Sequence, residues 1–251
     1  MTTQHRLLLL GATGETGKQA LSAALSDSRV SHVLTFGRRA PTLDPSTLST
    51  KLTHSSLDFD ALLKEGSAGG PETTKLRSAE ADSVLIALGT TRASAGSAEA
   101  FERIDREYVL SAARAARRED KPDQRVVYVS STSANSSAWF LYPRSKGLTE
   151  EGLASLGYAS TTIFRPGLLV APGGRGEHRF AESLAVKTIP RLRFGKSTLW
   201  IGTDTLGRSL VNAAVGSPAV KEYVKEEVLK GQHKVWVVSN ADALKLAEAG
   251  K

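Results

Sequence analysis

The chain has 251 residues, of which 40% are hydrophobic and 24% are charged. These values are typical of one globular core with at most a small appendage, and they exclude an intrinsically disordered chain. The absence of cysteine excludes disulfides, thiolate metal ligands and thiol nucleophiles. The five histidines show no spacing typical of a metal site, so we predict no bound metal.

The formal net charge of +7 would suit nucleic acid, an anionic membrane surface or a polyanionic cofactor. Basic residues alternate with acidic ones, as in 117–121 and 221–227, and they form no stripe interleaved with aromatic residues. We therefore favour a solvated basic surface and expect no nucleic-acid partner. No apolar run reaches the ~20 residues of a membrane span. The first predicted strand starts too early for a cleaved leader, so we expect no secretion.

The first predicted element is a buried strand at 7–10, which ends abruptly at Gly11. Gly14 and Gly17 follow, and an apolar pattern at helical spacing then predicts a helix. In such a unit the glycines permit a tight turn and let the backbone approach a pyrophosphate at the helix N-terminus. The alternative is a tight turn that binds no ligand. The candidate cofactor-binding residues here are Gly11, Thr13, Gly14, Glu15, Thr16 and Gly17.

The rest of the chain alternates short apolar runs with helical patterns. This order predicts parallel βαβ units and an α/β fold with a Rossmann-like, doubly wound parallel sheet. Residues 66–80 are rich in glycine, serine, threonine and charge, so we expect a surface excursion there. The predicted strands are 32–36, 52–57, 83–88, 125–129, 160–164 and 234–238, and the main predicted helices are 97–118, 143–156, 180–187, 203–215, 220–229 and 240–249.

We divide the single predicted domain into two parts. Residues 1–170 form a nucleotide-binding Rossmann core. Residues 171–251 are too few for an independent domain of usual size, so we expect a small C-terminal cap. This cap would close over the carboxyl edge of the sheet, where ligands bind in such folds, and would contact the substrate.

Two arginines, Arg38 and Arg39, follow the second predicted strand about 20 residues after the last glycine, where an NAD-binding fold places an acidic residue for the ribose hydroxyl. A carboxylate would repel a 2′-phosphate, whereas a guanidinium pairs with it, often through two hydrogen bonds. The pair therefore predicts NADP(H) rather than NAD(H). The alternative is an ordinary surface arginine pair.

Three further residues are candidate cofactor contacts. Asp58 follows the third predicted strand and could accept a hydrogen bond from an adenine amino group, or cap the short helix that follows, or do both. Leu88 and Gly89 close the fourth predicted strand, where a glycine would let the chain pass against a ribose. The alternative for these two is a plain strand terminus.

The candidate catalytic residues are Tyr142, Lys146 and Ser131. Tyr142 and Lys146 are four residues apart, so a helix places them on one face. The ammonium would lower the pKa of the phenol and could also hold the ribose hydroxyls, and the phenol would then exchange a proton with a carbonyl or alcohol oxygen. Ser131 follows the fifth predicted strand, and we choose it over Ser130 to orient that oxygen.

Two other positions complete the expectations. Leu168 or Leu169, after the sixth predicted strand, could pack on a nicotinamide ring, and the alternative is an ordinary turn. We expect Asp105, on the long helix, to be exposed or to pair with a neighbour on the helix surface, and we assign it no role.

These motifs resemble the short-chain dehydrogenase/reductase superfamily. They look most like its atypical branch, which contains the human HIV Tat-interacting oxidoreductase and fungal relatives at the mitochondrial outer membrane. The resemblance covers about residues 5–170, and the C-terminal third matches poorly. The matching stretches are Gly11–Gly17, Gly37–Arg39, Leu88–Arg92, Asp105–Leu110, Ser130–Ser131, Leu141–Lys146 and Phe164–Leu168.

The resemblance implies a Rossmann fold that binds NADPH, with Tyr142 as proton donor and acceptor and Lys146 on the cofactor. It also implies a monomer or homodimer, and peripheral attachment to the cytoplasmic face of the mitochondrial outer membrane. Three functions stay open: an NADP(H)-dependent oxidoreductase acting on an unidentified carbonyl or alcohol, an NADPH-binding regulatory or scaffold protein with little turnover, and a basic membrane or nucleic-acid binder. We favour the first, because the tyrosine–lysine pair is intact.

Overall fold

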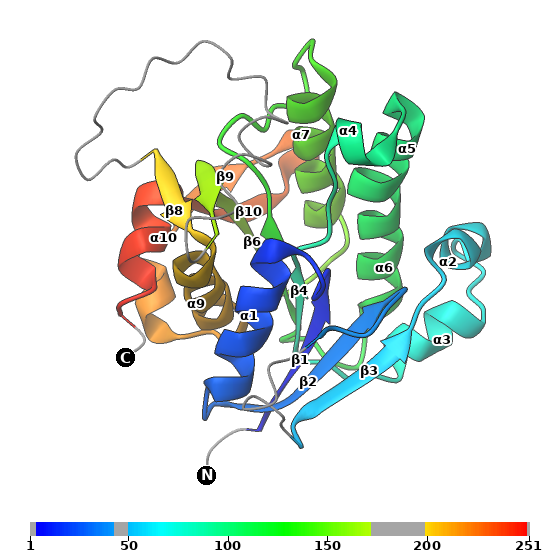
Figure 1. Cartoon of the computed structure of the whole chain (residues 1–251), viewed down its shortest axis with the longest axis horizontal. Helices are drawn as coiled ribbons and strands as arrows, with labels where there is room; N and C mark the ends of the chain where they lie inside the picture. The colour runs from blue at the N-terminus through cyan, green and yellow to red at the C-terminus, as the bar shows by residue number, and fades with distance from the viewer. Residues whose placement is uncertain (1–3, 43–49, 172–198, 250–251) are drawn as a thin grey trace.

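The computed structural model describes residues 4–42, 50–171 and 199–249. Its centre is an eight-stranded sheet with the order β3-β2-β1-β4-β5-β6-β10-β9 (Figure 1). All neighbouring pairs are parallel except β10 and β9. The strands are β1 (His5–Leu10), β2 (Val30–Gly37), β3 (Leu52–Ser56), β4 (Ser83–Ile86), β5 (Arg125–Val129), β6 (Ser160–Arg165), β9 (Lys225–Val228) and β10 (Lys234–Ser239). This order confirms the predicted Rossmann-like fold.

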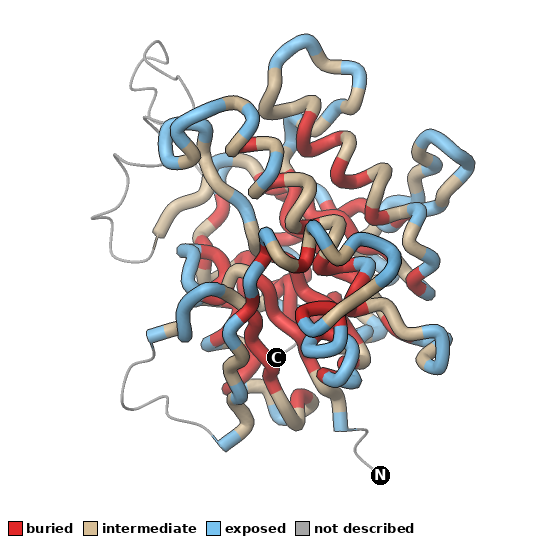
Figure 2. The backbone as a smooth tube through the Cα atoms, turned by 90° about the vertical axis from the view of Figure 1, so that its right-hand side faces the viewer, coloured by how far each residue is buried: buried red, intermediate tan, exposed pale blue. Residues whose placement is uncertain are grey.

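Helices cover both faces of the sheet because its strands are apolar on both sides. In β1, Leu7 and Leu9 face one helical layer, whereas Leu8 and Leu10 face the other. Figure 2 shows the buried backbone in the interior and the exposed backbone at the rim. The first layer holds α1 (Glu15–Ser26), α9 (Thr203–Ala214) and α10 (Asn240–Leu246), and the second holds α2 (Phe59–Glu65), α3 (Pro71–Arg77), α6 (Tyr108–Ala116) and α7 (Leu141–Ala154).

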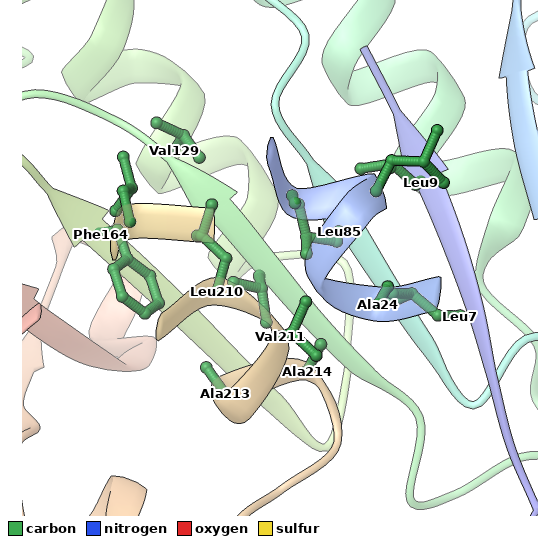
Figure 3. Close-up of a cluster of buried hydrophobic side chains, with 14 of the residues drawn as sticks. Leu7, Leu9, Ala24, Leu85, Val129, Phe164, Leu210, Val211, Ala213 and Ala214 are labelled. Carbon is green, nitrogen blue, oxygen red and sulfur yellow. The ribbon is translucent and has the colours of Figure 1, made fainter. Parts of the chain in front are cut away.

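The described part of the C-terminal third belongs to this same core. Leu210 of α9 is buried with Leu7 and Phe164 of the sheet (Figure 3). Helix α9 also lies close against α1, since a Cβ on Gly207 would stand only 2.7 Å from the backbone carbon of Gln19. Strand β10 extends the sheet beyond β6. The predicted helix at 180–187 lies outside the described residues, and the substrate-cap assignment stays a prediction.

Short elements connect these layers at the edges of the sheet. A second, two-stranded sheet pairs β7 with β8. The remaining elements are α4 (Arg92–Ala95), α5 (Ala98–Glu102), the π-helical turn η2 (Arg103–Glu107), β7 (Leu168–Val170), β8 (Trp200–Gly202), and the 3₁₀ turns η3 (Pro218–Glu222) and η4 (Lys230–Gln232).

The predicted helix at 220–229 is wrong. The segment forms the turn η3 and then β9, which pairs antiparallel with β10. Its alternating charges suit a helix surface, but they also suit an edge strand whose side chains face water. Pairing with β10, which no local pattern shows, decides between the two.

The predicted surface excursion at 66–80 contains helix α3. Pro71 occupies its first turn, a position that proline favours. The Glu65 carboxylate accepts hydrogen bonds from the backbone N–H groups of Glu72 and Thr73, at 2.8 Å each. Leu76 anchors the helix in the core. The polar composition did not predict this helix, because its N-terminus is capped by Glu65 from the preceding helix α2.

Candidate functional site

The glycine turn lies between β1 and α1, at the carboxyl edge of the sheet. Gly11 has φ of +86°, and a Cβ there would stand 2.5 Å from the carbonyl carbon of Ala87. A Cβ on Gly17 would overlap the carbonyl oxygen of Gly11. A Cβ on Gly14, in contrast, would meet only the Gly11 oxygen at 3.5 Å. The first and third glycines therefore pack the turn, and the middle one leaves its outer surface open.

The N-terminus of α1 is suited to an anion. Gly14 is the N-cap residue and has no side chain to accept from the first N–H groups of this 12-residue helix. Those donors and the helix dipole favour a phosphate. Glu15 pairs with Lys18 at 3.6 Å, and both side chains are about half exposed. The arrangement matches the predicted pyrophosphate cradle, with Thr13 exposed beside it and Thr16 turned inward.

A pocket joins this turn to the ends of β2 and β3. Both predicted arginines line it and are exposed, so their guanidinium groups are accessible to a ligand. Phe59 and Leu88 supply apolar walls. The residues that line it include Gly11, Thr13, Arg38, Arg39, His54, Phe59 and Leu88. An adenosine with a negatively charged ribose substituent fits this combination of backbone, cations and apolar surface.

His54 is a pocket residue that the sequence analysis did not single out. It lies on β3 beside Thr35 of β2, and its Nδ1 is 3.0 Å from the Thr35 hydroxyl. The sequence places His54 on the predicted strand that follows the arginine pair. That position indicates a pocket residue only when the pairing of β2 with β3 is known.

Asp58 acts as the N-cap of α2. Its Oδ1 accepts hydrogen bonds from the backbone N–H groups of Asp60 and Ala61, at 2.9 and 3.0 Å. The capping alternative is therefore confirmed, whereas the adenine contact stays a prediction. The neighbouring Phe59, not Asp58, lines the pocket.

Tyr142 and Lys146 both lie on α7, which begins at Leu141, two residues earlier than predicted. Tyr142 is half-buried in the first turn, and its ring packs on Phe101 of α5 with the centroids 6.0 Å apart. Gly147 lets the loop before α7 approach closely, since a Cβ there would overlap the amide nitrogen of Ser136. The predicted pair is thus placed on one helix beside the loop that carries Ser131.

Lys146 is buried, and its ammonium contacts two other elements. Nζ lies 3.1 Å from Oδ1 of Asp105 and 3.0 Å from the hydroxyl of Tyr128 on β5. Burial lowers the pKa of Lys146, but the charge of Asp105, together with the two tyrosines Tyr128 and Tyr142, outweighs it and holds that pKa well above its usual value. Burial also raises the pKa of Tyr128. Lys146 is therefore held in its charged form, and its contacts with Asp105 and Tyr128 hold the ammonium in place.

The expectation that Asp105 is exposed is wrong. The residue is 0% exposed and lies in the π turn η2. Gly89 accommodates the pair, because a Cβ there would stand 3.0 Å from Oδ1 of Asp105 and 3.6 Å from Nζ of Lys146. A signal was available: Asp105 is four residues from both Phe101 and Val109, on the apolar face of the predicted helix.

The serines after β5 divide into two roles. Ser130 is buried, and its hydroxyl is 2.5 Å from Oε1 of Glu150, which also forms a two-point ion pair with Arg165. Ser131 is only half-buried, and its hydroxyl lies 2.9 Å from that of Ser133. Because Ser130 is committed to a buried network, Ser131 is better placed to meet a substrate.

Leu168 begins β7 and is 42% exposed. Its N–H donates to the carbonyl of Leu199, and its strand pairs with β8 at Trp200. Gly167 permits this approach, since a Cβ there would overlap the Leu199 oxygen. The side chain is accessible at the carboxyl edge of the sheet, as a nicotinamide contact would require.

Known proteins resemble this chain along almost its whole length. No family model matches it. A protein named Fmp52, mitochondrial, from Candida albicans is 35% identical over 242 residues, which cover 96% of this chain and 97% of the relative. Its counterpart from Emericella nidulans is 34% identical over 242 residues, covering 94% and 96%. This chain belongs to the Fmp52 family.

Solved structures place this Fmp52-family chain among short-chain dehydrogenase/reductase folds. A short-chain dehydrogenase/reductase from Saccharomyces cerevisiae aligns with a TM-score of 0.65 at 14% identity, over 96% of this chain and 98% of the other. MoeE5, solved with UDP-glucose and NAD, aligns with a TM-score of 0.55 at 16% identity, over 83% and 71%. These likenesses confirm the fold.

Two kinds of feature are absent from the described residues. No helix there is long and apolar enough to cross a membrane. No cluster of three or more histidine or acidic side chains there could hold a metal ion.

Proposed function

We propose that this Fmp52-family chain is an NADP(H)-dependent oxidoreductase that acts on a carbonyl or alcohol group. The observation that carries the proposal is the arrangement along one edge of the sheet. The phosphate-suited turn and the Arg38–Arg39 pocket lie at β1 and β2, and Tyr142 and Lys146 lie beside β5. An extended dinucleotide would connect the two regions.

The pocket residues support NADP(H) rather than NAD(H). Arg38 and Arg39 would pair with the 2′-phosphate, and Gly14 with the N-terminus of α1 would hold the pyrophosphate. Leu88 and Gly89 would pass along the ribose, and Leu168 would pack on the nicotinamide.

The chemistry would follow from three side chains. When bound, the nicotinamide supplies or accepts the hydride. Tyr142 would give its phenolic proton to the carbonyl oxygen during reduction and take it back during oxidation. Ser131 would hydrogen-bond the same oxygen and fix its position. Lys146 would hold the ribose hydroxyls through a charged donor.

Replacing Tyr142 by Phe tests this function. The Tyr142→Phe variant should lose at least ~10²-fold in the reduction of a carbonyl panel, because it lacks the proton, while its NADPH affinity changes little. The decrease in NADPH absorbance measures the rate of reduction, and a fluorescence titration measures the NADPH affinity. Tyr158→Phe is the control, since that hydroxyl donates to the carbonyl of Ala113 within the core. Equal rates for wild type and Tyr142→Phe would contradict the assignment, and a wild type that binds NADPH without turnover would favour a regulatory role.

We also propose that the chain attaches peripherally to the cytoplasmic face of the mitochondrial outer membrane. The support is that its relatives are named mitochondrial, together with the net charge of +7. Fractionation tests the proposal: the chain should sediment with mitochondria, be released by alkaline carbonate and be digested by protease added outside intact organelles. Protection from that protease would contradict it.

A further inference from the structure

The buried ion pair between Asp105 and Lys146 is unusual for a pair that only stabilises a fold. Both side chains are almost fully buried, at 1% and 7% exposure. Burying two charges costs several kcal/mol, and apolar residues of the same size often serve stability as well or better. Apart from this ion pair, neither oxygen of Asp105 has a hydrogen-bond partner within the described structure, which adds to the cost. Stability alone therefore does not account for the pair.

The local backbone is shaped around this pair. Asp105 lies in the π turn η2, between α5 and α6, and such turns are frequent at functional sites. Gly89, in the loop between β4 and α4, leaves the space that the carboxylate and ammonium occupy. Two separate features of the chain thus make room for one charge beside Lys146.

The geometry also shows how many N–H groups of the Lys146 ammonium remain available to a ligand. An ammonium has three N–H groups. Asp105 lies 3.1 Å and the Tyr128 hydroxyl 3.0 Å from Nζ of Lys146. Two contacts hold the nitrogen from inside the fold, and the described residues offer the third N–H no further hydrogen-bond partner.

We propose that Asp105 is a positioning residue of the oxidoreductase site, which keeps Lys146 charged and directs its remaining N–H toward the cofactor ribose. The inference rests on the proposed function, because it assigns the free donor to a bound cofactor. Asp105 itself does not touch the reacting atoms. Tyr128 supports it as the second internal partner of the ammonium.

The titratable groups that face Lys146 come from three elements: Asp105 from η2, Tyr128 from β5 and Tyr142 from α7 itself. Only Asp105 is a carboxylic acid, the kind of group that can place a negative charge opposite the ammonium, whereas the other two are phenols. Replacing it by Asn keeps the shape and the burial but removes that charge. The pKa of Lys146 should then fall below its usual value, because burial is the largest influence on it and its main opposing influence would be lost.

Stability against pH tests the charge of Lys146 without any cofactor. The raised pKa in the wild type means that Lys146 adds no slope between about pH 7 and about pH 9.5, since its contribution disappears only above the lysine pKa of the unfolded chain. In Asp105→Asn the folded pKa is depressed, so the unfolded chain binds more protons and stability rises with pH in that window. The stability deficit of the variant should therefore shrink as pH rises. The double variant Asp105→Asn with Lys146→Met should show no such slope.

NADPH affinity against pH tests the coupling to the site. Wild-type affinity should stay constant from about pH 7 to about pH 9.5, whereas Asp105→Asn should bind roughly tenfold more weakly than the wild type at the upper end, because a charged donor is lost. Asp82→Asn is the matched control. It breaks an Asp82–Lys121 pair at the opposite edge of the sheet and should leave the affinity curve parallel to wild type.

The outcomes separate the two proposals. A fall of wild-type affinity within this pH window would overturn the positioning role, and this measurement holds even where Asp105→Asn does not fold. Parallel affinity curves for wild type and Asp105→Asn would also overturn it. A wild type that binds no nicotinamide nucleotide would sink the proposed function and with it the ribose contact, while the stability curves would still decide whether Asp105 keeps Lys146 charged.

Discussion

The two ends of the candidate crevice are built in opposite ways. At the adenosine end, Arg38 and Arg39 are exposed cations beside a glycine turn. At the nicotinamide end, Lys146 is a buried cation held by Asp105 and Tyr128. Both ends present a positive group to a ligand, but one is solvated and the other is enclosed by the fold.

This difference teaches where each charge acts. An exposed arginine is screened by water and salt, so it contributes little to folding and acts mainly when a phosphate binds. A buried lysine must be neutralised before any ligand arrives, because an unpaired charge in the interior is costly. Changes at the first end should therefore leave the stability of the fold almost unchanged, whereas changes at the second should lower it.

The largest expected effect is at the buried end. Lys146→Met leaves Asp105 as an unpaired buried carboxylate and should lower the free energy of unfolding by ~3–5 kcal/mol. Arg38→Met, at the exposed end, should change it by less than ~0.5 kcal/mol. Urea denaturation measures both. Similar losses for the two variants would remove the contrast between the ends.

A smaller effect is expected within the glycine turn. Gly17→Ala forces the helix away from the Gly11 carbonyl and should cost ~1–3 kcal/mol of unfolding free energy. Gly14→Ala meets only one atom at 3.5 Å and should cost less than ~1 kcal/mol while still weakening NADPH binding, because its methyl group faces the phosphate position. Thermal unfolding measures the stability of the two variants, and a nucleotide titration measures their NADPH affinity. A Gly14→Ala variant with unchanged affinity would place the pyrophosphate elsewhere.

The smallest expected effect is a change of cofactor preference. Arg38→Asp combined with Arg39→Ala should shift the NADPH/NADH affinity ratio by roughly tenfold or more, because a charge-assisted phosphate contact is lost and a repulsion is added. The stability should barely change, since both side chains are exposed. Raising the salt concentration should reduce the wild-type ratio for the same reason. An unchanged ratio in the double variant would refute the phosphate contact.

Most of the adenosine end could be predicted because its signals are local. Gly11, Gly14 and Gly17 stand in one turn, and the arginine pair directly follows a strand. Most contacts at the nicotinamide end could not be predicted from the sequence. Asp105, Tyr128 and Lys146 come from a π turn, a strand and a helix that lie far apart in the sequence. His54 was missed for the same reason, since its place beside Thr35 depends on strand pairing.

The amino-acid sequence by itself determined the seven parallel strands β1–β6 and β10, the glycine turn and the spacing of Tyr142 and Lys146. Each of these depends on neighbours within one or two turns of the chain, where apolar periodicity and glycine conformations act. The tertiary structure decided that 225–228 is an edge strand, that Asp105 is buried and that Lys146 has a counter-charge. These properties depend on which distant segments share the interior, and the energy of a charge there is set by partners that no local pattern reveals.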